Sequence, residues 1–73
     1  MTEGDQKGAE IDRLAADTAE KLRGRLSGLR LELRGDGVVL RGTARSFYAK
    51  QLAQHAVMTG TALPIVRNEI EVL

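Results

Sequence analysis

The chain is short, nearly neutral and free of cysteine. Its 73 residues include eleven Lys or Arg and ten Asp or Glu, which gives a formal net charge of +1. This length fits one small domain, and the lack of Cys excludes disulfides and thiolate metal sites. Because the charge is balanced and the aromatic residues are only Phe47 and Tyr48, nothing favours nucleic acid as a partner. No metal or cofactor is expected.

The sequence also lacks membrane and export signals. No uninterrupted apolar run exceeds three residues, far short of the ~20 that a transmembrane helix needs. Residues 1–10 have neither the basic nor the apolar region of a secretory signal. The sequence as written therefore predicts a cytoplasmic protein, whereas a domain cut from a longer chain would be compatible with an envelope-associated protein.

The first element expected is a helix that follows a polar tail. Residues 1–8 contain two glycines and no apolar periodicity, so we expect a disordered tail followed by a single domain at 9–73. From Ala9 onward, apolar residues and Thr18 recur at steps of three and four, which predicts a helix with Gly28 as its C-cap. This stripe consists of Ile11, Leu14, Ala15, Thr18, Leu22 and Leu26.

Two strands joined by a tight turn come next. Residues 29–34 alternate Leu with charged residues, which predicts a half-buried strand. A second strand is expected at 38–43, and the turn between them should hold at least one residue at positive φ. The turn consists of Gly35, Asp36 and Gly37. The residues expected to face the helices are Leu29, Leu31, Leu33, Val38, Leu40 and Gly42.

A second helix and a last strand complete the chain. Ser46 is the expected N-cap, Gly60 the expected helix end, and residues 65–73 a single final strand. The helix should pack the stripe of Ala49, Leu52, Ala53 and Ala56 against the sheet. In the last strand, the residues expected to face the core are Val66, Asn68, Ile70 and Val72.

The predicted fold class is therefore α+β. The order is α-β-β-α-β, with a three-stranded mixed sheet and two helices packed on one face. The sequence leaves open whether the last strand lies beside the first or the second.

The second half of the chain carries a family resemblance. The Gly-rich turn is followed by Val38-x-Leu40-x-Gly42, then Ser46, Lys50 and Ala53, and the chain closes on Val66-x-Asn68-x-Ile70-x-Val72. This pattern resembles the BON domain, the bacterial osmotic-shock and nodulation module, over residues 11–73. The family usually has Gly two residues before the Val of its Val-x-Leu-x-Gly, where this chain has Asp36. The resemblance implies a module that binds phospholipid surfaces or other proteins.

Candidate catalytic residues are few. His55 is the single His and lies off the apolar stripe of the second helix, so a surface side chain is favoured over a ligand or general base. The turn at 35–37 lacks the Lys-Ser/Thr ending of a phosphate loop, so a hairpin turn is favoured over an anion cradle. Gly42 is expected to permit a bulge or a close helix–sheet approach, and Asn68 to tie a loop to the sheet. Because no pair of groups suits proton transfer or nucleophilic attack, the chain is not expected to be an enzyme.

Candidate partner-binding residues fall on two surfaces. Phe47 and Met58 lie on the second helix opposite its apolar stripe, where exposed apolar groups mark contact with a partner or lipid. The alternative is that Phe47 folds over the hairpin and Met58 is an ordinary exposed residue. Val39 and four arginines lie on the strand face turned away from the helices, interleaved with Glu. This face is either a solvated mixed-charge surface or a docking surface for protein or anionic headgroups. These arginines are Arg30, Arg34, Arg41 and Arg67.

The sequence thus favours a non-catalytic interaction module that binds another protein or itself. The alternative function is peripheral binding to anionic phospholipid membranes through the arginines. The balanced charge of the chain weighs against that alternative.

Overall fold

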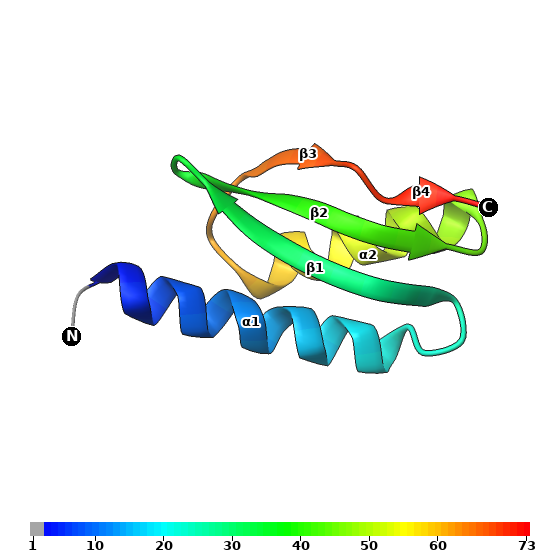
Figure 1. Cartoon of the computed structure of the whole chain (residues 1–73), viewed down its shortest axis with the longest axis horizontal. Helices are drawn as coiled ribbons and strands as arrows, with labels where there is room; N and C mark the ends of the chain where they lie inside the picture. Colours follow the sequence, from blue (N-terminus) through cyan, green and yellow to red (C-terminus); the bar gives the residue numbers. More distant parts are fainter. Residues whose placement is uncertain (1–2) are drawn as a thin grey trace.

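The protein is a small mixed β-sheet packed with two helices (Figure 1), and a computed structural model describes residues 3–73. The predicted α+β class and α-β-β-α-β order are confirmed, with the last predicted strand divided into two short pieces. The elements in chain order are α1 (Glu3–Lys21), β1 (Leu26–Arg34), β2 (Gly37–Ala44), α2 (Phe47–Gly60), β3 (Ile65–Asn68) and β4 (Glu71–Val72).

Strand β2 is the centre of the sheet. It pairs antiparallel with β1 and parallel with β3 and β4. The strand order that the sequence left open is therefore β1-β2-β3, with β4 following β3 along the same side of β2. This arrangement leaves β1 at one edge of the sheet.

Helix α1 begins and ends earlier than predicted. It starts at Glu3, so the predicted start at Ala9 is wrong. Residues 1 and 2 of the predicted tail lie outside the described residues. The helix ends at Lys21 because the chain turns at Gly24, which has φ of 87°. Leu26 is already the first residue of β1, where it pairs with Ala44 of β2. The apolar periodicity that predicts the helix therefore continues to Leu26, five residues beyond the last residue of α1.

The predicted C-cap, Gly28, instead lies inside β1. It has φ of 63°, and the pairing register of β1 with β2 shifts between Ser27 and Arg30. Across from it, a Cβ on Gly42 would stand 3.0 Å from the Ser27 carbonyl oxygen. Of the two roles predicted for Gly42, the structure has the bulge, since Gly42 lies against the irregular part of β1, and the predicted close approach of a helix to the sheet is wrong.

The hairpin turn has the predicted positive φ at its first residue. Gly35 has φ of 58°, whereas no non-Gly residue among those described has positive φ, so Asp36 does not. Gly at the first central position is the mark of a type II′ turn, which matches the twist of paired strands. Gly37 has another role, because a Cβ there would stand 2.7 Å from the Pro64 carbonyl oxygen.

The core lies between the sheet and the helices. Among the residues expected to face it, Leu31, Leu40 and Ile70 are buried, and Leu52 is half-buried beside them. Leu33 is 39% exposed, so the inward side of β1 is uncovered near the hairpin turn. The remaining buried residues of the core cluster are Ile11, Leu22, Leu26, Val38, Ala44, Ala49, Ala53 and Val57.

The predicted phase of the last strand is wrong at its start. Val66 is exposed, whereas Ile65 packs against the core. The cause is a shift in the register of β2 with β3, which pairs Val38 with Ile65 but Val39 with Arg67. Val66 is thereby the extra residue of a bulge, which reverses the alternation that precedes it. Val72 keeps the predicted phase, because it pairs with the buried Ala44, but it is 41% exposed near the end of the chain.

Candidate interaction surfaces

The outer face of α2 is set by the cap that starts the helix. As predicted, Ser46 is the N-cap, and its side-chain oxygen accepts a hydrogen bond from Ala49 N at 3.1 Å. Ala49, Ala53 and Val57 then point into the core. This orientation leaves the opposite side of the helix to solvent.

That side forms a shallow groove with β3. Phe47 and Met58 are 63% and 55% exposed, as the sequence predicts, and they contribute to a hollow of about 270 Å³. The sequence did not predict this groove, because the groove forms only where Asn68 of β3 lies beside α2. The groove residues of α2 recur at steps of three and four residues, and this spacing could have identified the side of α2 that lines the groove. The lining residues are Phe47, Lys50, Gln51, Gln54, His55, Met58 and Asn68.

Asn68 connects this groove to the sheet. Its Nδ2 donates to Gln54 Oε1 at 3.1 Å and to the Lys50 carbonyl oxygen at 3.4 Å. Its Oδ1 accepts from Ile70 N at 3.2 Å. The side chain therefore ties α2 to the junction of β3 and β4, and the predicted tie to the loops near Ala44 or Gly60 is wrong.

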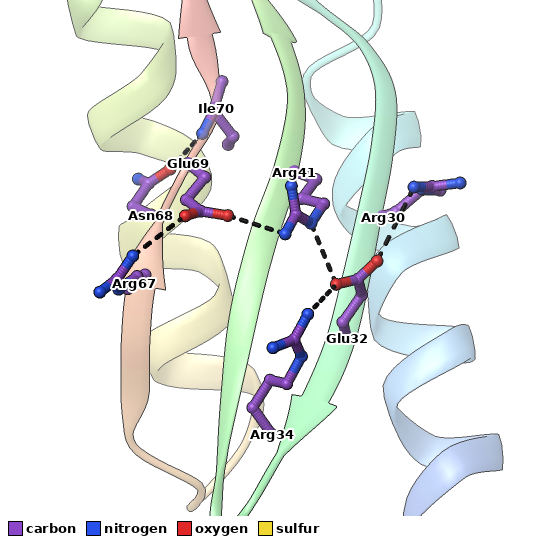
Figure 2. A network of polar contacts seen from close by, with 8 residues as sticks. All are labelled: Arg30, Glu32, Arg34, Arg41, Arg67, Asn68, Glu69 and Ile70. Atoms are coloured by element: carbon purple, nitrogen blue, oxygen red, sulfur yellow. Dashed lines mark hydrogen bonds and ion pairs between the residues drawn. The ribbon is translucent and has the colours of Figure 1, made fainter.

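The four predicted arginines do gather on one face of the sheet. Figure 2 shows them with Glu32 and Glu69 in front of the strands, while both helices lie behind. Arg41 is the hub, because its Nε donates to Glu32 at 3.0 Å and its terminal nitrogen pairs with Glu69 at 2.9 Å. The outer pairs are longer: Arg30–Glu32 at 3.7 Å, Arg34–Glu32 at 3.7 Å and Arg67–Glu69 at 3.5 Å.

This network is unevenly charged. Four arginines face two glutamates, so the six groups carry a net charge of +2. The hydrogen bond from Arg41 has the largest effect on the pKa of Glu32 and lowers it; desolvation comes next and opposes this effect, and the charges of Arg41, Arg34 and Arg30 add to the lowering. The same hydrogen bond to Glu32 raises the pKa of Arg41. Glu32 is thus ionised at neutral pH and lies within ion-pair distance of three arginines.

Val39 is not the exposed apolar contact that the sequence predicts. It is only 4% exposed, although it lies on the open face. Arg34, Arg41 and Arg67 surround it, and the apolar stems of arginine cover apolar surface while their charged ends stay in water. Val66, 53% exposed in the same hollow, is the accessible apolar side chain there.

Reactive groups are sparse on both surfaces. His55 is exposed on α2, beside Gln54 and Met58 in the groove. Among the residues that the structure describes, no three His, Asp or Glu side chains gather as a metal site would require. Within the same residues, no helix has the length and apolar character needed to cross a bilayer.

Comparison with known proteins assigns the chain to no family, because no family model, curated protein or solved structure matches it. The resemblance to BON domains therefore depends on the residues of this sequence alone.

Proposed function

We propose that this protein is a non-catalytic interaction module, resembling a BON domain, that binds a segment of another protein along α2. The observation that carries the proposal is the pairing of two exposed apolar side chains, Phe47 and Met58, with hydrogen-bonding groups in one groove. Isolated exposed apolar residues are ordinary, but apolar groups rimmed by polar ones mark binding surfaces.

The groove defines the chemistry of its partner. Phe47 and Met58 are eleven residues apart, which is about 16 Å along a helix. A partner would therefore bring two apolar side chains about that far apart, with amide or hydroxyl groups between them. Lys50 is the one Lys, Arg, Asp or Glu residue of the lining, so a carboxylate on the partner would complement it.

A screen of random peptides against the purified chain tests this function. We expect enrichment of sequences that combine apolar side chains with Asp or Glu, and roughly tenfold weaker binding of those peptides to Phe47→Ser or Met58→Ser. Tyr48→Ser is the matched control, because Tyr48 is 62% exposed next to Phe47 but does not line the groove. Equal losses in Phe47→Ser and Tyr48→Ser, or no enriched class, would contradict the proposal.

The arginine face supports a second candidate function, the binding of anionic phospholipid headgroups. Its net charge of +2 and the exposed side chains of Arg30 and Arg67 favour phosphate. Vesicles of phosphatidylglycerol and phosphatidylcholine test it by flotation. Binding that falls with salt and is lost in Arg34→Glu with Arg41→Glu, but not in Phe47→Ser, would support the membrane function.

Of the two candidate functions, we expect protein binding rather than binding of anionic phospholipid. Glu32 and Glu69 already engage the arginines, so the attraction to headgroups at physiological salt should be small. Strong flotation that is insensitive to the apolar substitutions would reverse this order.

A further inference from the structure

The edge strand β1 has main-chain groups directed away from the sheet. Val38 N donates to Pro64 O at 3.0 Å and Leu40 O accepts from Glu69 N at 2.8 Å, so these two residues of β2 bond toward the side of β3 and β4. Their partners in β1 are Leu33 and Leu31. Because antiparallel pairs alternate between bonded and non-bonded, Leu31 and Leu33 must direct their N–H and C=O groups outward.

No strand among the described residues pairs with this outer edge. The opposite edge of the sheet is short and broken, because β3 carries the bulge at Val66 and is separated from β4 by Glu69 and Ile70. Bulges and short strands are the usual protection of sheet edges. The regular part of β1 from Arg30 to Arg34 lacks both of these devices.

The side chains of a strand added at this edge would pack against helix α1. It lies alongside β1, on the side away from β2 in Figure 1 and behind the sheet in Figure 2. The side of α1 toward α2 carries Leu14 and Asp17, which share a hollow with Gly60. At about 100° per residue, the opposite flank holds small side chains and one Asp. These residues are Gly8, Asp12, Ala15 and Ala19.

The side chains of β1 define which strand would fit. Leu31 and the 39%-exposed Leu33 face the helix side, so an added strand would bring apolar side chains next to them. On the open face, Arg30 and Arg34 have side chains that are 71% and 63% exposed, and both share Glu32, which also binds Arg41. Acidic side chains of the added strand would lie opposite the two arginines.

We propose that the free edge of β1 binds an extended segment of a partner protein, in which acidic and apolar side chains alternate, as an additional strand of the sheet. The main chain of the segment would bond to Leu31 and Leu33. Its acidic side chains would lie beside Arg30 and Arg34, and its apolar side chains above the small flank of α1. This edge is separate from the α2 groove, so either proposal can fail without the other.

Amide hydrogen exchange with a synthetic peptide tests the proposal. The peptide Glu-Val-Thr-Val-Glu reads the same in both directions and places its glutamates opposite Arg30 and Arg34 in either orientation. In the free chain, we expect the amides of Leu31 and Leu33 to exchange faster than those of Arg30 and Glu32, which bond to β2. Saturating peptide should slow exchange at Leu31 and Leu33 selectively.

Charge reversal at the edge provides the matched variants. Arg30→Glu would replace an opposite-charge pair by a like-charge pair, for which we expect roughly fivefold weaker peptide binding. Arg67→Glu is the control, because Arg67 is equally exposed and also pairs with a glutamate, but on β3. Phe47→Ser should leave the affinity of this peptide unchanged.

Three outcomes would overturn the proposal. The first is equal weakening by Arg30→Glu and Arg67→Glu. The second is no change in exchange at Leu31 and Leu33 when the peptide is added at high concentration. The third is slow exchange at these amides in the free chain: with a dependence on protein concentration it would assign the edge to a second copy, and without one it would show that α1 already shields it.

Discussion

At the scale of single residues, Leu40 is the side chain on which the core most depends. It is fully buried at the centre of β2, within the core cluster between the sheet and the helices. Leu40→Ala should lower the free energy of unfolding by about 2–5 kcal/mol, because it removes apolar contact and leaves a cavity. Leu33→Ala, at the exposed end of β1, should cost less than about 1 kcal/mol. Chemical denaturation of both variants measures the difference, and equal effects would contradict the core described above.

Glu32 links stability to pH. Its pKa is lowered in the folded protein, first by the hydrogen bond from Arg41. A carboxylate of this kind contributes stability above its pKa in the unfolded chain, which is the usual value of about 4.5, and that contribution is lost as pH falls through the lowered pKa of the folded state. We therefore expect Glu32→Gln to show a shallower loss of stability below pH 4.5 than the wild type.

Thermal unfolding over a series of pH values checks this prediction. Glu10→Gln, which removes a carboxylate from the exposed side of α1, is the control. A pH profile for Glu32→Gln that parallels both the wild type and this control would show that the arginines do not stabilise the ionised form.

The burial of individual residues was predicted from the sequence where alternation is regular, and missed where it is not. Phe47 and Met58 are exposed as predicted, because the stripe of α2 fixes which side faces the core. Val39 is buried on the face expected to be open. A period of two assigns Val39 to a side of the sheet but says nothing about the long arginine side chains that close over it.

At the scale of elements, the hairpin turn and the start of β3 are locked together. A Cβ on Gly37 would stand 2.7 Å from the carbonyl oxygen of Pro64, which also accepts a hydrogen bond from Val38 N. Gly37→Ala must therefore push β3 away from β2, and we expect a loss of about 1–3 kcal/mol in the free energy of unfolding.

Asp36→Ala is the comparison for this prediction, since Asp36 is exposed in the same turn. Its stability should stay close to that of the wild type. If Gly37→Ala were equally mild, the contact between the turn and Pro64 would not constrain the strands.

The boundaries of elements and the pairing of strands were the parts that the sequence could not fix. Leu26 continues the helical spacing of α1, yet it lies in β1 and pairs with Ala44 of β2, because Gly24 permits a turn between the helix and the strand. The phase of β3 depends on where β2 accepts the extra residue Val66. Both outcomes are decided by contacts between distant segments, which local periodicity does not contain.

At the scale of the whole molecule, the three surfaces proposed to bind partners lie on different sides of one small domain. The α2 groove combines two apolar side chains with polar ones, the arginine face is charged, and the β1 edge presents main-chain groups. The arginine face was predicted because its residues follow a strict alternation. The groove and the edge needed the strand order and the position of Asn68 beside α2, neither of which the sequence fixes.

The boundary of the domain gives the last prediction. Although α1 begins at Glu3, Ile11 is the first core residue among residues 8–73, whose side chains the structure describes, and a Cβ on Gly8 would meet no atom within 4 Å. A chain that starts at Ala9 should therefore lose no more than about 1 kcal/mol, since short helical ends without tertiary packing contribute little. A chain that starts at Ala15 loses Ile11 and Leu14 from the core and should not fold. Thermal midpoints of the two truncations measure this, and a large loss in the first would show that residues 1–8 belong to the folded domain.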